Sequence, residues 1–84
     1  MNSIETNRAN SLPGPILVIG ASGFIGANLF RRFNAVRSDV YGTSSRPRPW
    51  RLSEVEENQV KVVDLLVEFE VDKLLAEVQP KTVF

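Results

Sequence analysis

Hydrophobic residues in this chain fall into two kinds of segment: short continuous runs, and longer stretches in which they recur every three or four positions. The run from Ile16 to Ile19 lies between Pro15 and Gly20. Such a bounded apolar run is typical of a strand buried on both faces of a parallel sheet. Further short apolar segments predict three more strands, namely Val40 to Thr43, Val60 to Val63 and Thr82 to Phe84.

The segments after the first and third predicted strands have the periodicity of amphipathic helices. The apolar stripe of the first helix would consist of Ile25, Leu29, Phe33 and Val36. That of the second helix would consist of Val67, Val71, Leu74, Leu75 and Val78. Asp64 is expected to cap the second helix, and Pro80 is expected to end it. Between the second and third strands, Ser53 to Asn58 predicts a short helix.

Strands that alternate with helices predict an α/β fold with a doubly wound parallel sheet. Right-handed crossovers would place the strands in the order 3-2-1-4, so the fourth strand covers the open edge of the first. That strand begins only at Thr82, and we therefore expect a fold truncated at the start of its fourth strand. Residues 1–15 are polar and end in Pro-Gly-Pro, which predicts a disordered leader.

Composition removes several classes of function. The 84 residues include 10 basic and 10 acidic side chains, and they contain no cysteine and no histidine. Disulfides, thiolate sites and imidazole-based metal sites are therefore excluded. The balanced charge argues against a nucleic-acid partner, and no apolar run is long enough to cross a membrane or to form a signal peptide. We expect a cytoplasmic protein without a metal site.

Candidate chemistry is concentrated in the turn between the first strand and the first helix, which reads Gly20-Ala21-Ser22-Gly23-Phe24-Ile25-Gly26. Gly20 permits a tight turn, Gly23 lets the backbone approach a pyrophosphate, and Gly26 lets the helix pack closely. The amides from Gly23 to Ile25 would then be unpaired donors at the positive end of the helix dipole. Ser22 would cap this turn or donate to a phosphate oxygen.

The alternative interpretation of this turn is a strand–helix connection with incidental glycines. A buried strand before the glycines and an amphipathic helix after them favour dinucleotide binding instead. A P-loop is disfavoured because no Gly-Lys-Ser/Thr follows the turn.

The stretch Ile-Leu-Val-Ile-Gly-Ala-Ser-Gly-Phe-Ile-Gly resembles the opening of the extended short-chain dehydrogenase/reductase family, the NAD-dependent epimerase/dehydratases. The resemblance runs from Ile16 to Phe84 and departs at Ile19, where many relatives have threonine. It implies that residues 16–84 are the incomplete N-terminal part of an NAD(P)-binding Rossmann domain. It also implies that the complete protein is an epimerase, dehydratase or oxidoreductase that acts on a nucleotide-sugar. A homodimer of the complete protein is a further expectation.

The choice between the two cofactors depends on the end of the second strand, where an NAD-selective domain carries an acidic residue that holds the ribose 2′-hydroxyl. That position falls at Ser44, followed by Ser45 and Arg46, with Arg48 close behind. Hydroxyls and an arginine suit the 2′-phosphate of NADP, so NADP is predicted to be preferred over NAD. The alternative is that Arg46, Arg48 and Arg51 are solvated loop cations.

The resemblance further implies that Asp64 and Leu65 contact the adenine, through the carboxylate and the backbone amide respectively. Helix capping by Asp64 is the alternative, and the two roles are compatible. The acidic residues that follow predict a solvated helix face, namely Glu68, Glu70, Asp72 and Glu77.

Catalytic residues are missing from the chain. Family members act through a tyrosine and a lysine four residues later, whereas the one tyrosine here, Tyr41, has Ser45 at that distance. We therefore expect no turnover from these 84 residues. A non-catalytic NAD(P)-binding sensor is the second hypothesis, and a Tyr-x-x-x-Lys beyond Phe84 would favour the enzyme. A methyltransferase is disfavoured because it would need an acidic residue near Ser44.

Overall fold

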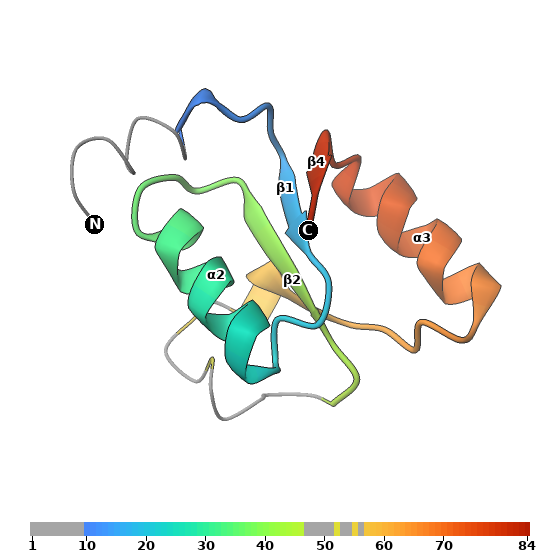
Figure 1. Cartoon of the computed structure of the whole chain (residues 1–84). Coiled ribbons are helices and arrows are strands. Elements are labelled where there is room, and N and C mark those ends of the chain that lie inside the picture. Colours follow the sequence, from blue (N-terminus) through green and yellow to red (C-terminus); the bar gives the residue numbers. More distant parts are fainter. Residues whose placement is uncertain (1–9, 47–51, 53–54, 56) are drawn as a thin grey trace.

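The computed structural model describes residues 10–46, 52, 55 and 57–84. Its elements alternate along the chain as the sequence predicts (Figure 1), in the order β1 (Ile16–Val18), α2 (Phe24–Asn34), β2 (Val40–Ser44), the 3₁₀ turn η2 (Glu57–Gln59), β3 (Val60–Val62), α3 (Glu68–Val78) and β4 (Thr82–Val83).

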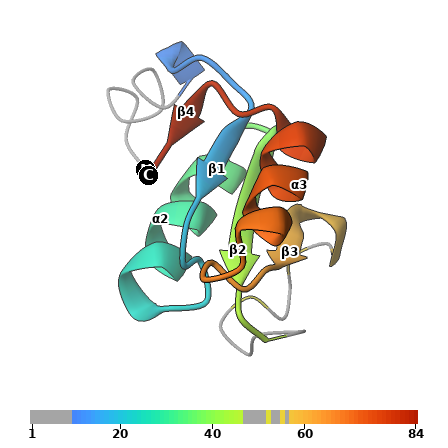
Figure 2. The same ribbon diagram turned by 90° about the vertical axis from the view of Figure 1, so that its right-hand side faces the viewer.

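The four strands form one parallel sheet in the order β3-β2-β1-β4, which confirms the predicted α/β class and strand order. Figure 2 shows α2 and α3 on opposite faces of this sheet, so the fold has three layers. The pairing of β1 with β4 extends past Val83, because Phe84 N–H donates to Leu17 C=O and Ile19 N–H donates to Phe84 C=O, each at 2.9 Å.

The central strand β1 supplies both halves of the core. Ile16 and Val18 belong to the cluster on the α2 side, whereas Leu17 belongs to the cluster on the α3 side. All three side chains are at most 1% exposed, as expected for a strand buried on both faces. Ile19, predicted as the last residue of this strand, instead begins the turn.

The cluster on the α2 side is the larger of the two, and Phe30 is its most buried aromatic residue. Helix α2 can approach β2 closely because Gly42 has no side chain. A Cβ atom there would lie 2.5 Å from the Ala21 Cβ and 3.1 Å from the Phe30 ring. Phe84 follows β4 and stacks on Phe33 of the same helix, with 5.2 Å between the ring centroids.

The apolar stripe predicted for the first helix is partly wrong. Its buried residues are Ala27, Phe30 and Phe33, whereas Ile25 is 80% exposed. Ile25 lies in the first turn of α2, ahead of the turns that pack on the strands. Leu29 and Val36 pack at the edge of the core as predicted.

On the α3 side, Leu74 and Val78 are buried together with Leu17 and Val63. The predicted stripe is therefore confirmed in its last turns and wrong at Val67 and Leu75, which are about 40% exposed (39% and 43%). The helix ends at Val78, where Gln79 adopts the left-handed conformation with φ 49°, one residue before Pro80.

Predicted boundaries of other elements also shift by short distances. The second strand extends one residue further, to Ser44, and the third ends one residue earlier, at Val62. The predicted short helix corresponds to η2 in its last part, while Ser53, Glu54 and Glu56 lie outside the described residues.

Part of the predicted leader is placed by the structure. Residues 1–9 lie outside the described range, but Leu12 packs against the α2-side core. Its carbonyl accepts a hydrogen bond of 2.8 Å from the Arg37 guanidinium. Residues 12–15 therefore contact the folded part of the chain.

Candidate functional site

Three loops meet at the carboxyl end of the parallel sheet and enclose a cavity of about 270 Å³. It lies where β1, β2 and β3 end, and ligands of open α/β sheets bind at this end. Six of the predicted site residues line it, namely Gly20, Ser22, Ser44, Ser45, Asp64 and Leu65. The other lining residues, Thr43, Val63 and Leu66, were not predicted. Typical ligand cavities measure roughly 300–1,000 Å³, so this one suits part of a dinucleotide better than the whole.

The first loop turns sharply at Gly20. Its φ of 71° lies in the left-handed region, where a side chain is strained. Thr43 of the neighbouring strand fixes the position of this turn twice. The Thr43 hydroxyl accepts the Gly20 N–H at 2.8 Å, and the Thr43 carbonyl accepts the Ala21 N–H at 2.9 Å.

The third glycine, Gly26, lies directly against this turn. A Cβ atom at Gly26 would lie 2.2 Å from the Gly20 carbonyl oxygen, far inside contact distance. Gly26 allows a close approach, as predicted, but the predicted partner is wrong: Gly26 lies against the turn and not against the sheet.

The second glycine corrects one prediction. The Gly23 N–H donates to the Gly20 carbonyl at 3.0 Å, so this amide is not an unpaired donor. Gly23 is also the N-cap residue of α2, with extended backbone angles and no side-chain cap. Ser22, which lies one residue earlier, therefore does not occupy the cap position.

The predicted bare amides begin at Phe24. The first helical hydrogen bond of α2 runs from the Ala27 N–H to the Gly23 carbonyl, at 2.8 Å. Among the described residues, no acceptor is recorded for the N–H groups of Phe24, Ile25 and Gly26. The helix therefore begins with unpaired donors, next to the exposed backbone of Gly20 and Gly23.

The two helices differ in how their positive ends are compensated. The first turn of α2 contains no acidic side chain, whereas the first turn of α3 contains Glu68 and Glu70. Carboxylates at a helix N-terminus stabilise it by offsetting the dipole. The positive end of α2 lacks this internal compensation, which suits an external anion such as a phosphate.

The loop after β2 is organised by Ser44, which is only 3% exposed. Its hydroxyl donates to the Arg46 carbonyl at 2.6 Å and accepts the Arg46 N–H at 3.1 Å. This turn leaves Ser45 and Arg46 exposed at the edge of the site. Ser45 lines the cavity and Arg46 does not, while Arg48 and Arg51 lie outside the described residues.

Asp64 shapes the loop after β3. Its carboxylate accepts the Leu66 N–H at 3.0 Å, which forms a local turn. The predicted capping of the second helix is wrong, because the N-cap of α3 is Val67 and no side chain caps it. Asp64 and Leu65 are both exposed and both line the cavity.

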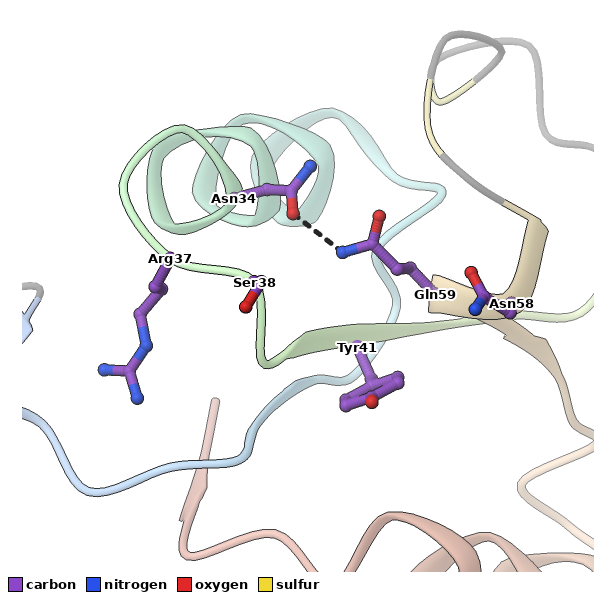
Figure 3. Close-up of a pocket in the computed structure, with 6 residues that line it drawn as sticks. All are labelled: Asn34, Arg37, Ser38, Tyr41, Asn58 and Gln59. Carbon is purple, nitrogen blue, oxygen red and sulfur yellow. Dashed lines mark hydrogen bonds between the residues drawn. The ribbon is translucent and has the colours of Figure 1, made fainter.

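A second cavity, of about 450 Å³, lies at the amino end of the sheet (Figure 3). Its lining is polar and consists of Asn34, Arg37, Ser38, Tyr41, Asn58 and Gln59. These groups mainly hold the fold together: the Gln59 amide donates to Asn34 at 2.7 Å and to the Val40 carbonyl at 3.2 Å. The carboxyl-end cavity is therefore the candidate site.

Other kinds of site find no support in the part of the chain that the structure describes. No group of three histidine, cysteine, aspartate or glutamate residues there could hold a metal ion. None of the helices among these residues has the length and apolar character needed to span a membrane. Tyr41 lies outside the candidate site, and its ring faces the Lys61 ammonium at 5.8 Å.

Comparison with known proteins gives one match. The model of the NAD dependent epimerase/dehydratase family matches residues 16–84, which span all the strands and helices described above. No curated protein and no solved structure matches the chain at a significant level.

Proposed function

The chain belongs to the NAD dependent epimerase/dehydratase family, and we propose that it binds NADP in preference to NAD at the carboxyl end of its sheet. The observation that carries this proposal is the row of unpaired amides at the start of α2, beside an exposed glycine backbone. These donors would hold the diphosphate, because a helix N-terminus offers both hydrogen bonds and a positive dipole.

The adenosine half of the cofactor would occupy the adjoining cavity. Asp64 and Leu65 line it at the end of β3, and we propose that they contact the adenine through the carboxylate and the backbone amide respectively. Ser44 and Ser45 line the same cavity at the end of β2. When bound, the nicotinamide ring would supply hydride transfer, and the residues of this chain would bind and orient the cofactor.

The preference for NADP rests on charge at the end of β2. Ser44 occupies the position where an acidic residue would select NAD, and the turn that it builds carries Arg46 at the surface. A guanidinium would pair with the 2′-phosphate of NADP, which a carboxylate would repel. Arg46 lies outside the cavity lining, so we expect it to reach the phosphate from the rim.

We propose that these residues serve as the dinucleotide-binding N-terminal part of an epimerase, dehydratase or reductase that acts on a nucleotide-sugar. What supports the reaction class is the family match over residues 16–84. The nucleotide-sugar, a homodimer, the cytoplasmic location and the absence of a nucleic-acid partner stay predictions. A non-catalytic NAD(P)-binding sensor is the alternative proposal, and a Tyr-x-x-x-Lys beyond Phe84 would favour the enzyme over it.

The experiment is calorimetric titration of the 84-residue chain with NADP and with NAD. We expect NADP to bind about tenfold more tightly, the equivalent of one charge-assisted hydrogen bond. Arg46→Ala should remove this difference without weakening NAD. Arg32→Ala is the matched control, since Arg32 is an exposed arginine in the last turn of α2.

Two outcomes would contradict the proposal. Equal binding of the two cofactors by the unaltered chain would overturn the NADP preference. Absence of binding by either cofactor, with the chain folded, would overturn the dinucleotide site itself.

A further inference from the structure

Thr43 has an unusual place among the residues around the candidate site. It is 2% exposed and belongs to the inner strand β2, although its side chain is polar. Its hydroxyl oxygen accepts the Gly20 N–H at 2.8 Å across 23 positions of sequence. Burial of a hydroxyl destabilises a protein unless the hydroxyl is hydrogen-bonded. The partner of the Thr43 hydroxyl is the first residue of the glycine turn.

Gly20 in turn determines where the following residues lie. Its carbonyl accepts the Gly23 N–H at 3.0 Å, and the same carbonyl lies against Gly26. The start of α2 is therefore held by contacts that converge on Gly20. Movement of Gly20 would displace the amides of Phe24 and Ile25, which lie in the first turn of that helix.

The neighbours of Gly20 are held by backbone hydrogen bonds, from the Ile19 N–H to Phe84 and from the Ala21 N–H to the Thr43 carbonyl, but the Gly20 N–H itself is held by the Thr43 hydroxyl. A Cβ atom built on Gly20 would meet nothing within 4 Å, and the residue is exposed. If the Thr43 hydroxyl were removed, the Gly20 N–H could regain a partner only by turning toward water. In such a displaced loop the amides of Phe24 and Ile25 would no longer be held in the arrangement that binds the diphosphate. The affinity for the dinucleotide falls in proportion to the fraction of molecules that keep this arrangement.

We propose that Thr43 is a positioning residue for the dinucleotide: through its hydrogen bond to Gly20 it holds the glycine turn in the conformation that receives the diphosphate. This inference rests on the proposed function. Thr43 also lines the cavity proposed for the adenosine, but its hydroxyl is bonded to Gly20, so we expect loss of the hydroxyl to act on the diphosphate end. The 2′-phosphate end of the adenosine, at Ser45 and Arg46, does not depend on the Gly20 hydrogen bond.

The test compares two ligands in three variants of the 84-residue chain. NADP needs the glycine turn, whereas adenosine 2′-monophosphate, which lacks the diphosphate, needs only the adenosine half of the site. Thr43→Val keeps the shape of the side chain and removes its hydroxyl. We expect it to weaken NADP binding about fivefold, as for loss of one hydrogen bond, and to leave the monophosphate unchanged.

Thr43→Ser is the conservative control, because it keeps the hydroxyl, and it should bind NADP like the unaltered chain. Thr43→Ala is the second hydroxyl-free variant and should show the same split between the two ligands as Thr43→Val. An amide spectrum recorded with ¹⁵N labelling supplies an independent readout. The Gly20 amide should exchange with solvent faster in both hydroxyl-free variants and remain protected in Thr43→Ser.

The outcomes separate this inference from the proposed function. If Thr43→Val binds NADP as tightly as the unaltered chain, Thr43 does not position the turn, although the dinucleotide site stands. If both ligands weaken equally, Thr43 has a general structural role and the inference is wrong. If the unaltered chain binds neither ligand, the proposed function is wrong.

Discussion

Polar groups at the two ends of the parallel sheet are used differently. At the amino end, polar groups bind one another: Arg37 pairs with Asp39 at 2.6 Å, and Gln59 donates to Asn34 at 2.7 Å. At the carboxyl end, the first amides of α2 have no acceptor among the residues that the structure describes. Hydrogen bonds between groups of the protein contribute to its stability, whereas unpaired donors are available to a ligand.

The difference extends to side chains. At the amino end, the Thr82 hydroxyl donates to the Pro13 carbonyl and Arg37 donates to the Leu12 carbonyl, so the segment before β1 is tied to the sheet. At the carboxyl end, Phe24 and Ile25 are 71% and 80% exposed. Substitutions at the amino end should therefore change stability, and several at the carboxyl end should change binding.

The largest effect is expected from Gly26→Ala. The new Cβ atom would lie 2.2 Å from the Gly20 carbonyl, a backbone atom that cannot rotate away. We expect the free energy of unfolding to fall by about 3 kcal/mol and NADP binding to be lost. Denaturant unfolding and calorimetry measure the two effects. Asn28→Ala, at an exposed position of the same helix, should leave both unchanged, and normal binding by Gly26→Ala would contradict the described packing.

Gly20→Ala should have a smaller effect on stability. Its methyl group would meet no atom within 4 Å, so only the φ of 71° opposes a side chain. The left-handed conformation costs about 1–2 kcal/mol for an ordinary residue. Thermal or denaturant unfolding should show this decrease. A stability equal to that of the unaltered chain would mean that the turn adopts another conformation in solution.

Gly23→Ala makes the same chemical change and should separate binding from stability. The backbone of Gly23 is extended, with φ −77° and ψ 168°, and a Cβ atom would lie at an ordinary 3.4 Å from the nearest atom. Stability should therefore change by less than about 0.5 kcal/mol. The methyl group would stand where the diphosphate approaches, so NADP affinity should fall about tenfold, as for one lost charge-assisted hydrogen bond. Unchanged affinity would place the diphosphate elsewhere.

The smallest effect is expected at the amino end, from Asp39→Asn. The hydrogen bonds from Arg37 hold the pKa of the Asp39 carboxyl below its usual value. The pair is partly exposed, so its loss should lower stability by less than about 1 kcal/mol, with no change in NADP affinity. Asp72→Asn, an exposed carboxylate of α3, is the charge-matched control.

The pH dependence of the same variant gives a second check. Because the folded-state pKa of Asp39 is lowered, its contribution is complete above the unfolded value of about 3.9 and is lost as the pH falls through the folded value. The stability difference between the unaltered chain and Asp39→Asn should therefore disappear in acid. A difference that persists at the lowest pH would show that the charge of Asp39 is not its source.

The sequence predicted the features that depend on local patterns. A four-residue apolar run is enough to identify the buried β1, and the alternation of strands and helices is enough for the strand order. The glycine spacing located the turn, because a left-handed φ and a close contact each exclude a side chain. Ser44 and Ser45, which line the cavity, were located by their place after the second predicted strand, whereas Asp64 and Leu65 were implied by the family resemblance.

What the sequence did not predict depends on contacts between distant residues. The buried face of α2 is set by Gly42, which accommodates Phe30, and not by the periodicity that included Ile25. The hydrogen bond from Gly20 to Thr43 joins two strands, and a threonine in a strand carries no sign of such a partner. The Gly23 amide was expected to be unpaired because the sequence does not give the conformation of the turn, which brings the Gly20 carbonyl within hydrogen-bond distance of this amide.

The amino end of the sheet satisfies its own polar groups, whereas the amides at the start of α2 have no acceptor among the described residues. Titration of the ¹⁵N-labelled chain with NADP, followed in amide spectra, shows which of these two ends the ligand contacts. The expectation is that the amides of Phe24 and Ile25 shift most, together with those of Asp64 and Leu65, while those of Asn34 and Gln59 stay in place. Shifts confined to Asn34, Gln59 and their neighbours, or no shift at Phe24 and Ile25 at saturation, would contradict it.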